Sequence, residues 1–308
     1  MTISEYFDSK KTLNLVGHKK NFNFFKDLIL KDMLPKVIML SGEKGIGKAT
    51  LINHIMHFYF EKKNYDENNN KILKKTHFTE LYENDLFSNI IYLKGSEFKN
   101  TKIEDIRILK SNLLKTTLNN DKRFIIFDDV ENFNTNSLNA LLKLIEEPGA
   151  NNYFILINNK TKPLLETIKS RSLEIKIILD EESRKKIISF LLKNFEQKIS
   201  LNEDLVATTP GNFVKFNYVI QTNKIKIEDN FLDNLEKLLK LYKKEKNLFF
   251  KDLILFLFDY YFQIDRSKRI FSNDKLIEKR TLIVKNINNF FLYNLSQSAL
   301  LSSIKNNI

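Results

Sequence analysis

Short, almost wholly apolar runs recur through residues 1–180, with helix-length segments between them. Because nearly every position of such a run is apolar, each run predicts a strand buried on both faces of a parallel sheet. Strands that alternate with helices in this way predict a doubly wound α/β layer structure. The runs span Val37–Ser41, Asn89–Leu93, Arg123–Asp128, Tyr153–Asn158 and Leu173–Ile178, and the predicted helices span Ala49–Glu61, Ile103–Leu118 and Thr135–Glu146.

The pattern changes to helical spacing after Ile178. The segment Glu181–Phe195 opens with acidic residues, which suits the N-terminus of a helix. Pro210–Gly211 predicts a turn before a further helix, and from Ile227 onward the spacing is helical to the end of the chain. These changes predict an α/β domain at residues 1–179, a small helical domain at 180–224 and a helical C-terminal domain at 225–308.

The formal charge of +12 suits work beside a polyanion such as DNA or beside an acidic protein. A lysine-rich proteome explains the same charge equally well. No basic cluster interleaved with aromatic residues stands out in the sequence. Direct DNA binding as the sole function is therefore the least favoured hypothesis.

The absence of cysteine excludes disulfides, thiolate metal sites and cysteine nucleophiles. His54 and His57 are three positions apart with no evident third ligand, so no metal site is predicted. The beginning of the chain has no apolar signal-peptide core, and the run Leu253–Phe258 is far shorter than the roughly 18 apolar residues that span a bilayer. We therefore expect a cytoplasmic protein with no membrane partner.

A glycine-rich loop directly follows the first predicted strand and precedes a predicted amphipathic helix. Gly42, Gly45, Gly47 and Lys48 form the pattern that cradles phosphate in P-loop proteins. The glycines let backbone N–H groups converge on phosphate oxygens, the helix N-terminus adds positive potential, and the lysine reaches the outer phosphates. The position of the loop after a buried strand predicts a nucleotide site, with ATP as the candidate ligand.

The residue after the lysine departs from the pattern of a hydrolysing site. A working loop carries Ser or Thr there, because the hydroxyl coordinates Mg²⁺. Here that residue is Ala49, and Thr50 follows it. One helical step rotates the Thr50 side chain by about 100° away from the metal. The loop is therefore predicted to contact nucleotide through residues 42–50, with weakened Mg²⁺ coordination.

Polar residues end two further predicted strands. Asp128 ends the run RFIIFD, which is the usual place of the Mg²⁺ partner in a P-loop protein. Asp129 follows, where ATP-hydrolysing proteins of this broad class carry a glutamate base. Its carboxylate is one methylene shorter and would lie back from an attacking water. Asn158, after YFILI, is predicted to contact a phosphate or a water molecule.

The stretch from Phe124 to Ser172 resembles the clamp-loader branch of the AAA+ ATPases. NALLKLIEEPG at Asn139–Gly149 is similar to the NALLKTLEEPP signature of that family, and TIKSRS at Thr167–Ser172 is similar to its T-I-x-S-R-C motif. Val16–His18 and Lys102–Leu114 fit the same pattern. The resemblance covers roughly residues 12–215, and the helical tail fits the family in position and type only.

The resemblance implies an AAA+ base domain with a five-stranded parallel sheet, followed by a helical lid and a C-terminal collar for oligomerisation. It also implies that Arg171, at the S-R-C position, is offered in trans to the ATP site of a neighbouring subunit. Family ATPases carry G-S-x-R in the lid, whose arginine senses the γ-phosphate. This chain has Val214 at that arginine position, with Lys215 beside it.

Ala49, Asp129 and Val214 together favour a member of the ring that hydrolyses ATP weakly or not at all. Its expected partners are the gamma/tau and delta subunits of a bacterial loader, with the sliding clamp and primed DNA contacted through the assembled complex. The alternative is an active clamp-loader ATPase of gamma/tau type, which would need Thr50 or water to replace the missing hydroxyl ligand.

Many members of this branch carry a four-cysteine zinc module after the helix that follows the phosphate loop. This chain has no cysteine, so no zinc is expected. The polar run Lys62–Lys75 predicts a surface loop or insertion at that place.

Overall fold

A computed structural model describes residues 3–95, 121–267 and 273–306 of the chain. The predicted helix Ile103–Leu118 and the segment Lys102–Leu114 lie outside these residues. The chain forms two compact units. The first contains residues 1–187 and 209–212, and the second contains residues 188–208 and 213–308. The predicted division of the helical part into residues 180–224 and 225–308 stays a prediction.

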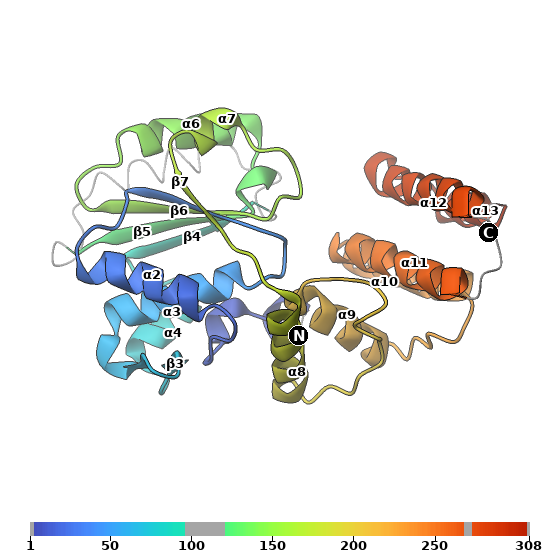
Figure 1. Cartoon of the computed structure of the whole chain (residues 1–308). Coiled ribbons are helices and arrows are strands. Elements are labelled where there is room, and N and C mark those ends of the chain that lie inside the picture. The colour runs from blue at the N-terminus through green and yellow to red at the C-terminus, as the bar shows by residue number, and fades with distance from the viewer. Residues whose placement is uncertain (1–2, 96–120, 268–272, 307–308) are drawn as a thin grey trace. The chain divides into compact units, whose positions relative to one another are not determined.

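The first unit is built on a five-stranded parallel sheet with the strand order β4-β5-β6-β1-β7. All five strands lie within two residues of the predicted runs, which confirms the α/β fold class. Helices α2 (Lys19–Leu30) and α3 (Lys48–Phe60) cover one face of the sheet, and α6 (Thr135–Glu146) and α7 (Glu166–Lys169) cover the other (Figure 1). The strands are β1 (Val37–Ser41), β4 (Ile90–Lys94), β5 (Arg123–Asp128), β6 (Asn152–Asn158) and β7 (Leu173–Lys176).

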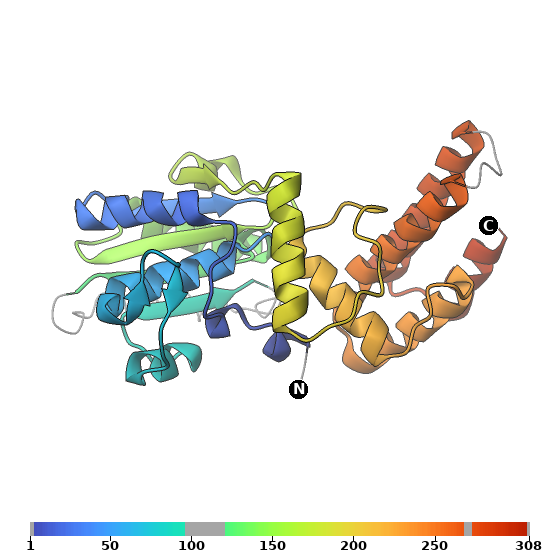
Figure 2. The ribbon, with the colours of Figure 1, turned by 60° about the horizontal axis from the view of Figure 1, so that its bottom comes forward.

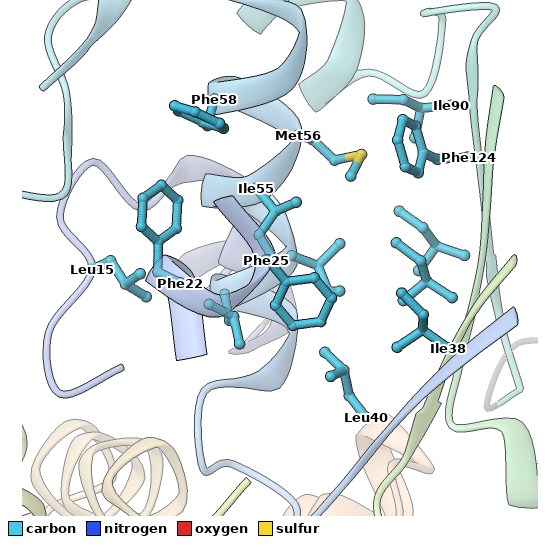
Figure 3. Packing of buried hydrophobic residues seen from close by; sticks show 14 of the residues in the cluster. Leu15, Phe22, Phe25, Ile38, Leu40, Ile55, Met56, Phe58, Ile90 and Phe124 are labelled. Carbon is cyan, nitrogen blue, oxygen red and sulfur yellow. The ribbon is translucent and has the colours of Figure 1, made fainter. Parts of the chain in front are cut away.

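Apolar residues on both faces of the strands explain why the runs do not alternate with polar residues. In β1, Ile38 and Leu40 pack toward α2 and α3, whereas Val37 and Met39 belong to the cluster on the opposite face. Figure 3 shows Phe25 and Met56 from the two helices filling the space in front of the strands. Successive side chains of a strand point to opposite faces, so burial on both faces requires a continuous apolar run.

Helix α3 is buried almost all round, which differs from the amphipathic helix that the sequence predicts. Residues 51–58 are all buried, including His54 and His57. The cause is the segment between α3 and β4, which is not a plain surface loop. It places Tyr65 and Ile72 in the core and lies beside α3 (Figure 2). Its elements are η2 (Lys62–Asn64), a hairpin of β2 (Tyr65–Asp66) and β3 (Lys71–Ile72), and α4 (His77–Glu83).

In the described residues of the second unit, the regular elements are all helices, joined by turns and loops. Asp259 of α11 accepts two hydrogen bonds from Arg280 of α12, at 2.7 and 3.0 Å, which join these helices. The prediction of a turn at Pro210–Gly211 is wrong, because these two residues begin a helix. Proline suits the first helical position, because an N–H group there would have no partner within the helix. The helices are α8 (Glu181–Asn194), α9 (Pro210–Thr222), α10 (Phe231–Glu245), α11 (Phe249–Ser267), α12 (Asn273–Tyr293) and α13 (Gln297–Lys305), of which α8 and α9 begin in the first unit.

The N-terminal segment belongs to the first unit and includes α1 (Ile3–Tyr6) and η1 (Ser9–Lys11). Lys10 of η1 is buried and forms an ion pair with Asp85 at 2.5 Å, which ties this segment to the residues after α4. Within the described residues, no helix combines enough length and apolar character to cross a bilayer.

Candidate nucleotide site and arginine finger

The candidate nucleotide site lies at the carboxyl ends of three neighbouring strands. The phosphate loop follows β1, Asp128 ends β5 and Asn158 ends β6. The register pairs Ser41 with Asn158 and Asp128 with Ile157, so these ends share one edge of the sheet. Ligands of open α/β sheets bind at this edge, outside the carboxyl ends of the strands.

Two glycines give the loop its shape. Gly45 has φ +85° and Gly47 has φ +106°, which are backbone conformations that residues with a Cβ atom rarely adopt. A Cβ on Gly47 would lie 2.7 Å from Nε2 of His18, and that nitrogen lies 2.7 Å from the carbonyl oxygen of Ile46. A carbonyl only accepts hydrogen bonds, so Nε2 of His18 carries the proton and donates it. Burial lowers the pKa of His18, which favours this neutral form.

Lys48 is the first residue of α3 and is held inside the loop. Its side chain is 3% exposed, and Nζ donates to the carbonyl oxygens of Gly42 at 2.6 Å and Glu43 at 2.8 Å. Burial lowers the pKa of Lys48 to about 8, although the nearby carboxylates of Asp128 and Glu131 act in the opposite direction. The loop carbonyls and the carboxylates of Asp128 and Glu131 thus stabilise the positive charge of the Lys48 ammonium group.

Residues at and just before the start of α9 form hydrogen bonds with backbone carbonyls of the loop, which sequence reasoning missed. The carbonyl oxygen of Lys44 accepts from Oγ1 of Thr209 at 2.7 Å and from Nδ2 of Asn212 at 3.1 Å. The N–H of Gly211 donates to the carbonyl oxygen of Gly45 at 2.9 Å. These three hydrogen bonds attach the loop carbonyls of Lys44 and Gly45 to the start of α9.

The metal side of the site differs from that of a hydrolysing P-loop protein. Ala49 has no hydroxyl group, and its methyl group packs against the core cluster beneath the sheet. Thr50, the next residue, lies one step further along α3. Within the described residues, no group of three or more histidine, aspartate or glutamate side chains is arranged to hold a metal ion.

Asp128 is bonded to protein groups. Its carboxylate accepts from Oη of Tyr92 at 2.8 Å and from the N–H of Asp129 at 2.9 Å. Burial and the charge of Asp129 raise the pKa of Asp128, and burial raises the pKa of Tyr92, which keeps that phenol protonated as a donor. Tyr92 was missed because an aromatic residue in an apolar strand predicts only packing.

Asp129 has a left-handed backbone with φ 54° and accepts a hydrogen bond from the side-chain amide of Asn159. Beside it, the buried carboxylate of Glu131 accepts from the N–H of Asn159 and from the N–H and hydroxyl of Thr161, at 2.8 to 3.2 Å. These bonds fix the loop that follows β6 against the end of β5. Asn159 and Glu131 were missed by sequence reasoning, which considered only the strand ends themselves.

Asn158 is 5% exposed, and its Oδ1 accepts from the N–H of Lys160 at 2.9 Å. Its carbonyl oxygen accepts from the N–H of Gly42 at 3.2 Å, which joins the end of β6 to the phosphate loop. Of the two consecutive asparagines, Asn159 is thus the one whose side chain bonds an acidic residue of the site. The role of Asn158 toward phosphate or water stays a prediction.

Arg171 lies two residues beyond the end of α7, in the turn between α7 and β7. Its side chain is 40% exposed and forms an ion pair with Glu146, the last residue of α6, with 2.9 Å between Nη2 and Oε1. Nη1 also donates to the carbonyl oxygen of Thr167 at 3.0 Å. A guanidinium on an exposed turn is chemically suited to bind an anion carried by another molecule.

The phosphate loop after β1, the parallel sheet with this strand order and the helices that follow define a P-loop protein of the AAA+ fold class. Residues 17–180, more than half of the 308-residue chain, match the family described as DNA polymerase III, delta subunit. The chain belongs to this family of clamp-loader subunits, which confirms the resemblance that the motifs predicted.

Individual relatives carry two subunit names. A DNA polymerase III subunit gamma of Buchnera aphidicola subsp. Schizaphis graminum is 28% identical over 166 residues, which cover 52% of this chain and 44% of that protein. A subunit delta' of Bacillus subtilis is 25% identical over 220 residues, covering 70% of this chain and 61% of that protein. The chain therefore spans less than two thirds of the length of either relative.

Among solved structures, a DNA polymerase III gamma subunit-related protein of Thermotoga maritima is similar, with a TM-score of 0.52 and 17% identity. The similarity covers 93% of this chain and 99% of that one. At this level of identity the likeness concerns the fold, which agrees with a sheet domain followed by helices.

Proposed function

We propose that this chain is the delta-prime subunit of a DNA polymerase III clamp loader. In this proposal it forms a ring with the gamma/tau and delta subunits, and the ring loads the sliding clamp on primed DNA. The chain hydrolyses ATP weakly or not at all, and it gives Arg171 to the ATP site of a neighbouring subunit. The observation that carries the proposal is the contrast between an exposed Arg171 and an altered nucleotide site.

The altered site supports weak or absent hydrolysis. Ala49 supplies no hydroxyl for Mg²⁺, and Asp128 already accepts hydrogen bonds from Tyr92 and from the backbone. The carboxylate of Asp129 accepts a hydrogen bond from the side-chain amide of Asn159. Ala49 has no ligand atom to offer, and the hydrogen bonds that Asp128 and Asp129 accept compete with a metal ion or an attacking water molecule for their carboxylates. ATP can still be accommodated by the loop as a bound, unhydrolysed ligand.

The exposure of Arg171 supports its action in trans. A guanidinium near a γ-phosphate stabilises the charge that develops during phosphoryl transfer, and an arginine finger contributes roughly 10³- to 10⁵-fold in rate. The helical regions at residues 180–224 and 225–308 would then serve as lid and collar, with the collar holding the ring together. Both assignments follow from the family and are part of the proposal.

An active ATPase of gamma/tau type is the second candidate, and the phosphate loop itself favours it. The positive φ angles of Gly45 and Gly47, and the position of the Lys48 ammonium group inside the loop, support phosphate binding. The gamma subunit of Buchnera aphidicola is also 28% identical over 166 residues. This candidate requires Thr50 or a water molecule to complete the metal site.

ATP turnover by the purified full chain separates the two candidates. We expect no turnover that depends on Lys48, because the chain lacks a hydroxyl ligand after its lysine. The measurement compares the wild-type chain with Lys48→Ala, and with Ala49→Thr as the variant that restores the hydroxyl. Robust turnover by the wild type that Lys48→Ala abolishes would contradict the proposal and favour the gamma/tau-type enzyme.

A further inference from the structure

Two acceptors from two different helices hold the guanidinium of Arg171. Oε1 of Glu146 lies 2.9 Å from Nη2, and the carbonyl oxygen of Thr167 accepts from Nη1 at 3.0 Å. Glu146 ends α6, and Thr167 lies within α7. The side chain of Arg171 therefore has a defined direction although it is 40% exposed.

Both acceptors are attached to well-packed helices. Next to Glu146 along α6, Leu144 and Ile145 are buried against the sheet. Next to Thr167 along α7, Ile168 is fully buried in the same cluster. Packing in this shared cluster fixes the backbones of the two helices relative to each other, so the core sets the position of the Thr167 carbonyl and of the Glu146 backbone from which the carboxylate extends.

The arrangement leaves part of the guanidinium for another anion. An arginine side chain has five N–H donors in a planar fork. The contacts with Glu146 and Thr167 engage one N–H on each terminal nitrogen. Three N–H groups remain, which is enough for a bidentate contact with phosphate oxygens. Arg171 can thus bind a phosphate group without first leaving Glu146.

We propose that Glu146 is a positioning residue that, with the Thr167 carbonyl, orients Arg171 toward the nucleotide of a neighbouring subunit. The inference rests on the proposed function, in which Arg171 acts in trans. Glu146 lies within the segment NALLKLIEEPG. Its ion pair with Arg171 therefore joins this segment to the segment TIKSRS. Its acidic side chain fixes the guanidinium, and the adjacent Glu147 serves as the control position.

The ion pair is exposed on both sides, at 40% for Arg171 and 46% for Glu146. An exposed ion pair changes a conformational population by about fivefold at most. Loss of the pair should therefore lower the fraction of correctly oriented Arg171, without abolishing its action. The expected effect is a moderate fall in turnover number, with no change in the affinity of the neighbouring site for ATP.

The test measures kcat and KM for ATP of the reconstituted loader, stimulated by clamp and primed DNA, with variants in this chain. Glu146→Ala should lower kcat about two- to fivefold and leave KM unchanged. Glu146→Gln keeps an acceptor oxygen and should restore most of the rate. Glu147→Ala should match the wild type. In an Arg171→Ala background, Glu146→Ala should cause no further loss, because the two residues act together.

The outcomes that overturn the inference differ from those that overturn the proposed function. A normal or raised kcat in Glu146→Ala, together with a lowered kcat in Arg171→Ala, removes the positioning role and leaves the arginine finger in place. A further loss on adding Glu146→Ala to Arg171→Ala also removes it, because Glu146 would then act independently. A normal kcat in Arg171→Ala itself overturns the proposed function.

Discussion

At the scale of single residues, His18 and Gly47 show how closely the phosphate loop is packed. The imidazole donates to the carbonyl of Ile46 and occupies the space that a side chain at position 47 would need. Gly47 also begins α3 as its N-terminal cap, with a positive φ. Both the backbone conformation and the neighbouring ring therefore require glycine at this position.

We predict that Gly47→Ala lowers the free energy of unfolding more than Gly149→Ala does. Position 149 also has a positive φ, of +71°, but a Cβ there meets only the amide of Asn152 at 3.3 Å. A left-handed conformation alone costs about 1–2 kcal/mol for alanine. Gly47→Ala should exceed that cost, because its methyl group also displaces His18. Urea unfolding of both variants measures the difference, and equal losses would show that His18 moves aside freely.

The loop residues were predictable from sequence because glycine spacing carries information about the backbone. Thr209 and Asn212, which bond the same loop, are 165 and 168 positions from Lys44, and no local pattern indicates such a contact. Asn158 ends β6 and Asn159 follows it, and the sequence does not show which side chain turns toward Asp129. That choice depends on the turn that follows, where Lys160 has φ 55°.

At the scale of elements, α3 and the segment of residues 61–85 stabilise each other through aromatic packing. His57 packs edge-on against Phe78 and Tyr82, and neither of its ring nitrogens has a hydrogen-bond partner. His54 lies 3.0 Å from Oη of Tyr65 through Nδ1. Burial in this packing lowers the pKa of both histidines, so both are neutral at pH 7.

We predict that acid weakens the fold through these two histidines. Burial lowers the pKa of His54 to about 3 and that of His57 to about 4, whereas in the unfolded chain both are near 6.5. The stabilisation is therefore fully present above pH 6.5. As the pH falls below 6.5 the unfolded state binds more protons, and stability decreases by up to about 1.4 kcal/mol per pH unit for each histidine.

Urea unfolding between pH 7.5 and 5 tests this prediction. His57→Leu removes an unbonded, titratable ring from an apolar site, so it should flatten the pH dependence at little cost in stability at pH 7.5. His77→Gln, at the exposed first residue of α4, is the matched control and should leave the slope unchanged. An unaltered slope in His57→Leu would place the proton uptake elsewhere.

The same elements show what the pattern of apolar residues determines. Val37–Ser41 and Arg123–Asp128 were predicted with the observed bounds, because a strand buried on both faces has an unbroken apolar run. Residues 62–75 were predicted as a surface loop or insertion, and the polar residues that dominate this run gave no sign that Tyr65 and Ile72 are buried. Their burial depends on contact with α3, which periodicity within the segment does not contain.

At the scale of the whole molecule, a sheet unit carries the candidate nucleotide site and Arg171, and a second unit is helical. Unit 1 includes residues 209–212, so the start of α9 belongs with the phosphate loop that it bonds. The fold class and the family followed from strand pattern and motifs. The names of the relatives divide between gamma and delta', so the subunit type has to be determined by activity.

ATP turnover by the reconstituted loader, with Arg171→Ala in this chain alone, shows whether Arg171 acts at the ATP site of a neighbouring subunit. Lys169→Ala is the matched control, because Lys169 is a similarly exposed cation of the same turn, paired with Glu166 at 2.7 Å. We predict that Arg171→Ala lowers clamp- and DNA-stimulated turnover while the ring still assembles, and that Lys169→Ala leaves turnover unchanged. Unchanged turnover in an assembled Arg171→Ala ring would contradict this prediction.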